Sequence, residues 1–273
     1  MIPRKFTLFF WMTNRFYMNN LFIRIVSGVF YAGIIISVLL PFAPKYSFTS
    51  LMIVVGVLGM YELYKISDIE NKIQVSLGII TSIGIILSYN YHFFSLKMII
   101  IPLYFLFLVE LFNFQKFSFK NIGITLTGIV LIIIPITLSI EIINANYEYL
   151  LKLFVLLWVN DSFAFIVGKK YGEIKLYKSI SPNKTWEGFL SGLLMTLLVS
   201  FFLFSHLSLF FKISFSLIIS IGGTLGDLVE SMFKRKAGVK DSGNLIPAHG
   251  GILDRFDSFF FSVPFVYLLL NFL

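Results

Sequence analysis

The chain has 273 residues, of which 58% are hydrophobic and only 13% are charged. A soluble domain carries about twice that share of charged residues, so the composition excludes an ordinary soluble globular protein. In such an apolar chain the net charge of +8 indicates basic loops on one side of a bilayer, and we expect no nucleic acid as a partner. Cysteine is absent, which excludes disulfides, thiolate metal sites and thiol nucleophiles.

Long apolar runs follow one another along the chain, and a helix that crosses a bilayer needs about 20 mainly apolar residues. Residues 1–23 are basic and aromatic without a cleavage site, which predicts an interfacial or re-entrant segment. We then expect about nine transmembrane helices, at residues 24–43, 48–66, 73–91, 95–113, 122–143, 149–168, 187–211, 213–231 and 256–273. The sequence therefore predicts an all-α, polytopic integral membrane protein with a single membrane-embedded domain over residues 1–273.

The basic residues are unevenly divided between the two sides of this topology. With the amino terminus in the cytoplasm, 18 of the 22 lysines and arginines lie on the cytoplasmic side. The four outer ones are Lys45, Lys97, Lys152 and Lys212. Because cytoplasmic loops are enriched in lysine and arginine, we expect this orientation. It puts the two longest polar loops, 169–186 and 232–255, on the cytoplasmic face and predicts an active site there.

Acidic residues lie within or beside the apolar runs, where an ionisable group normally faces protein, water or a metal. Asp227 and Glu230 share one helix face at a spacing of three residues, beside three glycines that would let another helix or a ligand approach closely. Asp254 and Asp257 repeat that spacing, and Asp161 lies in another apolar run. Buried pairs with lysine or arginine are one explanation. Several acids converging at one membrane face favour a site for a hard cation such as Mg²⁺.

Other polar residues receive separate interpretations. We expect Glu62 and Glu110, near inner helix ends, to be solvated or paired with neighbouring lysines. His249 is the only histidine in a polar motif. Gly250 and Gly251 follow it, so the backbone can turn sharply there and bring amide N–H groups against an anion.

A spaced polar pattern runs from residue 231 to residue 257. It consists of Ser231, Lys234-Arg235, Lys240-Asp241, Gly243, Pro247, His249-Gly250-Gly251 and Asp254-Arg255-x-Asp257. This pattern resembles the signature of the phosphatidate cytidylyltransferases, also called CDP-diacylglycerol synthases. Residues 181–188 (Ser-Pro-Asn-Lys-Thr-Trp-Glu-Gly) and 160–164 (Asn-Asp-Ser-Phe-Ala) look like two further motifs of that family. The motif-level resemblance therefore lies within residues 121–273.

The resemblance implies an enzyme of phospholipid biosynthesis that converts CTP and phosphatidic acid to CDP-diacylglycerol and pyrophosphate. It implies Mg²⁺ as a cofactor together with a second cation, for which a monovalent ion is one candidate. Asp227 and Asp254 are the leading metal ligands, and Asp161, Glu230 and Asp257 are second candidates. The expected catalytic residues are Lys184, Asp227, Lys240, His249, Asp254 and Arg255. The expected substrate-binding residues are Ser181, Lys184, Lys234, Arg235, Lys240, Asp241 and Arg255.

Two other functions stay open at this point. A CTP-dependent kinase of a polyprenol-type lipid would share the acids and metals but should lack the complete histidine-glycine-glycine segment. A secondary transporter would place its acids at the bilayer midplane and show internal symmetry. For the enzyme we expect a multi-pass protein of the bacterial inner (cytoplasmic) membrane, surrounded by membrane lipids. A homodimer is compatible with the sequence.

Overall fold

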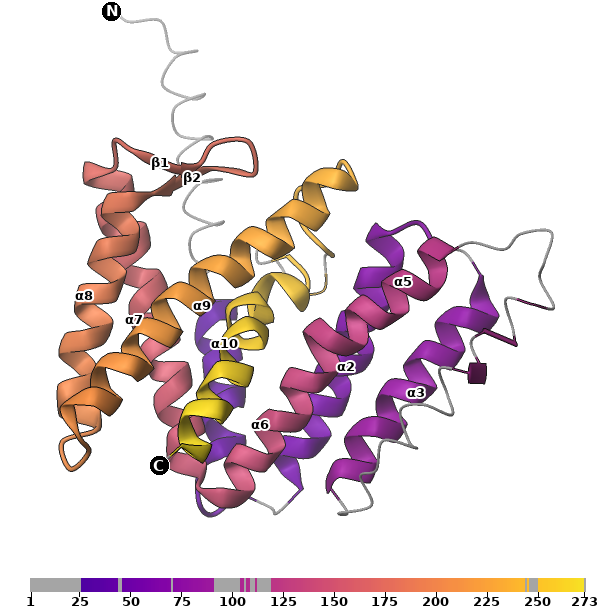
Figure 1. Cartoon of the computed structure of the whole chain (residues 1–273), viewed down its shortest axis with the longest axis horizontal. Coiled ribbons are helices and arrows are strands. Elements are labelled where there is room, and N and C mark those ends of the chain that lie inside the picture. Colours follow the sequence, from indigo (N-terminus) through magenta and orange to yellow (C-terminus); the bar gives the residue numbers. More distant parts are fainter. Residues whose placement is uncertain are drawn as a thin grey trace, which may run out of the picture.

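The computed structural model describes residues 26–43, 46–69, 71–90, 119–243 and 250–272, and the isolated residues 104, 105, 107, 108, 111 and 245. In this part of the chain the structure is helical apart from one two-stranded hairpin and short turns (Figure 1). Five helices are long and apolar enough to cross a membrane. These findings support an all-α membrane protein. The count of nine helices stays a prediction, and so does the interfacial segment at 1–23, which lies outside the described residues.

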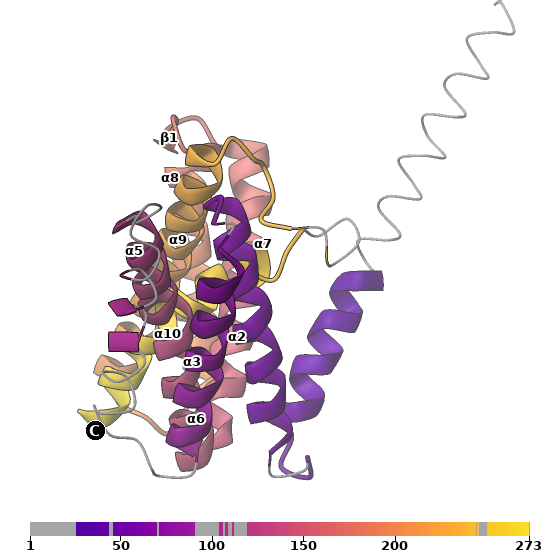
Figure 2. The ribbon, with the colours of Figure 1, turned by 90° about the vertical axis from the view of Figure 1, so that its right-hand side faces the viewer.

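Among the residues that the structure describes, the first half of the chain supplies three helices and one longer, irregular helix. An apolar helix covers Val26–Leu39, α2 covers Ser47–Ile66 and α3 covers Lys72–Asn90. A continuous helix then comprises α5 (Phe119–Gly128), η2 (Ile129–Ile133) and α6 (Ile134–Ala145). The η2 segment is a π-helical turn that ends two residues before Pro135, which has no N–H to donate to the preceding turn. Figure 2 shows the Val26–Leu39 helix standing beside the bundle.

The second half forms four long helices and the hairpin. The elements are α7 (Tyr147–Tyr171), β1 (Lys175–Tyr177), β2 (Ser181–Thr185), α8 (Trp186–Leu203), α9 (Leu209–Lys236) and α10 (Leu253–Asn271). The two strands are antiparallel. Arg235 Nε, at the end of α9, donates to the carbonyl oxygen of Ile180 at 3.4 Å. The hairpin and the end of α9 therefore lie at the same end of the bundle, as the predicted topology requires (Figure 1).

Glycines set the spacing between neighbouring helices. A Cβ atom at Gly188 of α8 would lie 2.7 Å from the carbonyl oxygen of Ala164 in α7. On α9, a Cβ at Gly226 would lie 2.4 Å from the carbonyl oxygen of Asp257 in α10. Both distances are shorter than side chains tolerate, so only glycine permits these close contacts. The predicted close approach at the glycines of α9 is confirmed, and its partner is α10.

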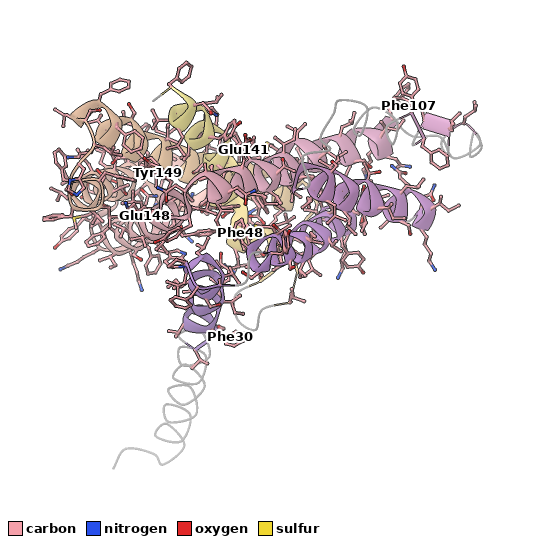
Figure 3. All side chains as sticks on the ribbon, turned by 90° about the horizontal axis from the view of Figure 1, so that it is seen from below. Phe30, Phe48, Phe107, Glu141, Glu148 and Tyr149 are labelled. Atoms are coloured by element: carbon pink, nitrogen blue, oxygen red, sulfur yellow. The ribbon has the colours of Figure 1, made fainter. Side chains whose placement is uncertain are left out.

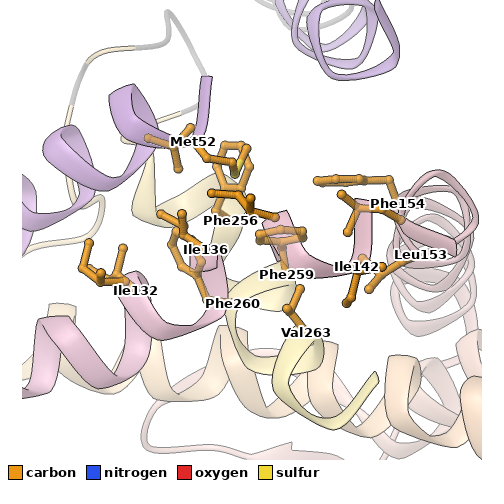
Figure 4. Packing of buried hydrophobic residues seen from close by; sticks show 14 of the residues in the cluster. Met52, Ile132, Ile136, Ile142, Leu153, Phe154, Phe256, Phe259, Phe260 and Val263 are labelled. Atoms are coloured by element: carbon orange, nitrogen blue, oxygen red, sulfur yellow. The ribbon is translucent and has the colours of Figure 1, made fainter. Parts of the chain in front are cut away.

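The core surrounds α10. Its aromatic side chains Phe256, Phe259 and Phe260 pack against aliphatic residues of η2, α6 and α2 (Figure 4). Phe154 of α7 stacks on Phe259, with ring centroids 4.8 Å apart and an interplanar angle of 11°. This packing holds α10 between the two halves of the chain, and it therefore fixes the direction in which the polar start of α10 points.

Large apolar side chains also cover the outside of the bundle, where Phe30 of the first helix is 70% exposed (Figure 3). Leu190, Leu194 and Leu198 of α8 are exposed and recur every four residues, so they form one outward apolar stripe. A soluble protein rarely exposes surface of this kind, whereas a lipid environment accommodates it.

The predicted spans agree with the helices except at one boundary. Helices occupy eight of the nine predicted positions, and the remaining one, 95–113, lies mostly outside the described residues. The division between spans 187–211 and 213–231 is wrong, because α8 ends at Leu203 and α9 begins at Leu209. Ser208 explains the new start: its Oγ accepts a hydrogen bond from the N–H of Phe211 at 3.2 Å and caps α9. The hairpin also went unpredicted.

The contact at Gly226 yields a stability prediction. Gly226→Ala should destabilise the protein by about 1–3 kcal/mol, because the added methyl group must push backbone atoms of α10 away. The measurement is the midpoint of thermal unfolding of the purified protein in detergent. Gly123→Ala in α5 is the control, since no atom lies within 4 Å of the added Cβ, and its midpoint should not fall. Equal midpoints for both variants would contradict the proposed tight contact.

Candidate functional site

Three carboxylates lie together where α9 and α10 touch. One oxygen from each of Asp227, Glu230 and Asp257 can be chosen so that all lie within 4.8 Å of one another. Asp227 and Glu230 are one helical turn apart on α9, as their spacing predicts. Asp257 comes from α10, which Gly226 admits to close range. The sequence predicted the helix face but not that Asp257 would lie opposite it.

Lys184 of β2 reaches this cluster from the hairpin. Its Nζ lies 2.6 Å from Asp227 Oδ2 and donates to the carbonyl oxygen of Thr224 at 3.3 Å. The Lys184 side chain is 25% exposed and that of Asp227 is 39% exposed, so water still reaches the pair. Ser231 Oγ donates to the other carboxylate oxygen of Asp227 at 3.2 Å.

The rest of the 181–188 motif builds the support for Lys184. Thr185 Oγ1 accepts from the N–H of Gly188 at 3.2 Å and caps the start of α8. Glu187 Oε1 accepts from the N–H of Ile174 at 3.1 Å, which ties α8 to the beginning of the hairpin. Gly188 provides the close contact with α7. These contacts anchor the strand that carries Lys184 to α7 and α8.

Lys234 connects two buried carboxylates. Its ammonium group pairs with Glu230 one turn earlier on α9 and with Asp254 Oδ1 of α10 at 2.5 Å. The Lys234 side chain is 10% exposed, and those of Glu230 and Asp254 are 9% and 5% exposed. Desolvated charges of this kind are stable only when paired, so Lys234 is needed to hold both acids in place.

The second oxygen of Asp254 accepts hydrogen bonds from the loop that precedes α10. Asp254 Oδ2 accepts from the N–H of Ser242 at 2.9 Å, from its hydroxyl at 3.0 Å, and from the N–H of Gly251 at 2.8 Å. Gly250 has a positive φ of 84°, which confirms the sharp turn predicted there. The sequence predicted that amide N–H groups of this turn contact an anion. For the amide of Gly251, that anion is the carboxylate of Asp254.

Glu62 of α2 also belongs to this network, and the expectation that it is solvated or paired with lysine is wrong. The residue is only 6% exposed. Its carboxylate accepts from the N–H groups of Ile252 and Leu253 at 2.9 and 3.0 Å and from Ser242 Oγ at 2.8 Å. The sequence around residue 62 contains no motif that predicts hydrogen-bond partners almost 200 positions later.

A polar cavity of about 400 Å³ opens beside the carboxylates. Its lining includes Asp161 and Ser162 of α7, and Asp254, Arg255 and Asp257 of α10. The helix Val26–Leu39 forms the opposite wall, where the hydroxyl group of Tyr31 donates to the carbonyl oxygen of Arg255 at 3.1 Å. The Arg255 side chain therefore stands at the edge of an open, polar space. The Tyr31 contact is a second feature that the sequence motifs did not indicate.

The remaining predicted site residues lie at the rim or outside the described part of the chain. Lys240 and Asp241 are exposed in the loop after α9, and Ser181 opens β2. Arg235 donates to two backbone carbonyl groups, those of Ile180 and Val239. His249 lies outside the described residues.

The charges of the assembled site do not balance. The described residues of this network include six carboxylates and three cationic side chains. The acids are Glu62, Asp161, Asp227, Glu230, Asp254 and Asp257, and the cations are Lys184, Lys234 and Arg255. An excess of carboxylate oxygens next to an open cavity is the chemistry that favours a hard divalent cation.

The buried ion pairs lead to a prediction about Lys234. Lys234→Met should destabilise the protein by about 3–5 kcal/mol, because Glu230 and Asp254 would stay buried without their counter-charge. Thermal unfolding in detergent would measure the change. Lys236→Met, two residues later and exposed, is the control and should shift stability by less than about 0.5 kcal/mol. A small effect at Lys234 would mean that the two acids do not need it.

Known proteins resemble the chain over most of its length. A profile of the family described as "Cytidylyltransferase family" matches residues 22–273. A phosphatidate cytidylyltransferase of Bacillus subtilis (strain 168) is 36% identical over 265 residues, which cover 90% of this chain and 96% of the relative. A phosphatidate cytidylyltransferase of Staphylococcus aureus (strain COL) is 36% identical over 232 residues, which cover 81% and 89%.

Proposed function

Because the chain belongs to the cytidylyltransferase family, as the match over residues 22–273 shows, we propose that it transfers the cytidylyl group of CTP to phosphatidic acid. The products are CDP-diacylglycerol and pyrophosphate, and the reaction serves phospholipid biosynthesis. The named relatives support these substrates. They do not favour a lipid kinase or a transporter.

One structural observation supports the proposal most directly. The polar cavity is lined by Asp161 of α7 and by Asp254, Arg255 and Asp257 of α10. Asp257 also belongs to the carboxylate cluster with Asp227 and Glu230 of α9, and Lys184 pairs with Asp227 in that cluster. A water-soluble nucleotide can enter such an opening, and a lipid phosphate can reach it from the surrounding bilayer. The motifs at 160–164 and 231–257 supply the charged residues of the cavity lining, and the motif at 181–188 supplies Lys184 of the neighbouring cluster.

The reaction sets a clear electrostatic task. An oxygen of the phosphatidate phosphate attacks the α-phosphorus of CTP, a new P–O bond forms, and the bond to the β-phosphate breaks so that pyrophosphate leaves with the electron pair. A phosphate monoester has its second pKa near 6, so the attacking oxygen is largely ionised at neutral pH and needs no general base. The main obstacle is repulsion between two anions, which positioned positive charge relieves.

The cationic side chains have distinct tasks in this scheme. Lys184 and Arg255 bind the triphosphate or the lipid phosphate, because Arg255 lines the cavity, Lys184 pairs with Asp227 beside Asp257 of that lining, and both cations stay partly exposed. Lys234 is buried between two acids and holds α9 and α10 in position. The exposed residues Arg235, Lys240 and Asp241, with Ser181 and His249, are proposed to contact substrates from the loops.

The donor set fits Mg²⁺, which when bound would neutralise charge on the triphosphate. Asp227, Glu230 and Asp257 offer clustered oxygens. Asp254 would act as a ligand only in exchange for its ion pair with Lys234. Asp161 faces the same cavity. We also propose a second cation, because the carboxylates of this network outnumber its cationic side chains by three.

We further propose that the protein lies in the inner membrane of a bacterium, with the hairpin end of the bundle facing the cytoplasm. The uneven distribution of basic residues supports that orientation. Lys152 and Lys212 lie near the beginnings of α7 and α9, at the end of the bundle opposite the hairpin (Figure 1). The outward stripe of α8 would contact membrane lipids or a second copy of the chain.

The activity is tested directly with purified protein in mixed micelles, labelled CTP and phosphatidic acid. We expect CDP-diacylglycerol to form, EDTA to abolish its formation and Mg²⁺ to restore it. Asp227→Asn should lower kcat/KM by about 100-fold or more, because the carboxylate would lose a charge needed at the site. Lys236→Ala is the control and should retain activity within about threefold.

Two results would count against this proposal. Full activity in EDTA would remove the metal from it. Phosphorylation of a polyprenol-type alcohol, with no product from phosphatidic acid, would assign the site to a lipid kinase.

The orientation is tested with single cysteines, since the natural chain has none. Lys178→Cys in the hairpin and Lys240→Cys after α9 should both react with a membrane-impermeant maleimide only from the cytoplasmic side. Lys212→Cys should react only from the outside. Labelling of the two loop positions from opposite sides would contradict a shared site, and labelling of both from the outside would reverse the orientation.

A further inference from the structure

Glu62 links the first half of the chain to the loop and helix that carry the site. It lies in the last turns of α2 and is 6% exposed. Its Oε1 accepts from the N–H of Ile252, and its Oε2 accepts from the N–H of Leu253 and from Ser242 Oγ. Three donors from a segment 180 to 191 positions away thus converge on one carboxylate.

The start of α10 explains why a carboxylate is present. The first N–H groups of a helix have no partner within the helix, and the helix dipole makes that end positive. Ile252 and Leu253 supply two such groups, and Glu62 accepts both. A cap of this kind usually comes from the adjoining loop, whereas here α2 provides it. The position of α10 therefore depends on α2.

Two glycines keep the space that the carboxylate needs. A Cβ at Gly243 would lie 2.6 Å from Glu62 Oε1, and one at Gly251 would lie 2.3 Å from Glu62 Oε2. Because larger residues would displace the carboxylate, the loop on both sides of residues 244–249 is shaped around the Glu62 side chain. If the Glu62 carboxylate only needed water or a surface lysine as its partner, glycine would not be required at positions 243 and 251.

The Ser242 hydroxyl connects Glu62 to the site. It lies 2.8 Å from Glu62 and 3.0 Å from Asp254, and its single proton can be directed at either carboxylate. The amides of Ser242 and Gly251 hold the same oxygen of Asp254. Glu62 itself is absent from the lining of the polar cavity, so it has no contact with the space where substrates would bind.

We propose that Glu62 is a positioning residue of the active site. It fixes the loop before α10 and the first turn of α10, and in this way it holds Asp254, Arg255 and Asp257 in the orientation that binding and transfer require. The role in catalysis rests on the proposed function. The fixing of the loop is independent of it, so the two are tested by different measurements.

The test uses Glu62→Gln in the full-length protein in detergent. Glutamine keeps the volume but replaces one acceptor oxygen with a donor NH₂ group, which must then face an N–H or the hydroxyl. Hydrogen–deuterium exchange of peptides that span residues 250–258 should become about 10-fold faster, whereas peptides from α7 and α8 should be unchanged. The half-saturating Mg²⁺ concentration should rise, or kcat should fall, by about 10-fold or more, because groups that orient metal ligands have effects of that size.

The control is Glu148→Gln, the same chemical change at the opposite end of the bundle, where Glu148 pairs with Lys152 on the surface (Figure 3). It should leave exchange at 250–258 and the Mg²⁺ dependence unchanged. A second variant, Ser242→Ala, removes the hydroxyl link alone. It should produce part of the Glu62→Gln effect on exchange, Mg²⁺ dependence and kcat. In the variant that carries both substitutions, each of these quantities should stay within about threefold of its value in Glu62→Gln.

Each outcome decides the proposal. Unchanged exchange at 250–258 in Glu62→Gln would overturn it, and so would a uniform rise across all helices, which would show a general role in stability. Faster local exchange with unaltered Mg²⁺ dependence and kcat would also overturn a positioning role. If Glu62→Gln does not accumulate as folded protein, Ser242→Ala is judged by the same criteria. If the natural chain makes no CDP-diacylglycerol, the proposed function fails, while the exchange measurement still decides whether Glu62 holds the loop.

Discussion

The contact between α9 and α10 at Gly226 determines where the charged groups of the site lie. Because no side chain separates the two backbones there, carboxylates on both helices come within a few ångströms of one another. Such proximity is unfavourable unless positive charge is supplied. Lys184 arrives from the hairpin and Lys234 from α9 itself. The helix contact thus creates an electrostatic requirement that the surrounding elements are placed to meet.

The same requirement explains the division of labour among the basic residues. Lys234 is buried between two acids and is absent from the cavity lining, whereas Arg255 lines the cavity and is exposed. Lys184 is intermediate, since it is paired with Asp227 and partly exposed. A buried pair maintains structure, and an exposed cation can exchange its partner for a phosphate oxygen. Burial therefore separates residues that the sequence motif presents as equivalent.

Sequence patterns recovered most of the fold because lipid imposes simple rules. The lengths of the apolar runs located the helices. The spacing of three residues correctly predicted that Asp227 and Glu230 lie on one face of a helix. Contacts between helices are not encoded in such local patterns. The sequence therefore missed that Asp257 faces Asp227 and that Glu62 caps α10. It also missed the hairpin, whose ends are held by Glu187 and by packing against α7, since short strands leave little periodicity.

The cap that α2 provides for α10 has a consequence for how this protein can be divided. The recognisable motifs are confined to the second half of the chain, which suggests a catalytic part preceded by a membrane anchor. The hydrogen bonds from Ile252, Leu253 and Ser242 to Glu62 cross that division. A fragment with all the motifs would have two unsatisfied N–H groups at the start of its central helix. The site is therefore not a module that evolution or an engineer can transplant without the helix at residues 47–66.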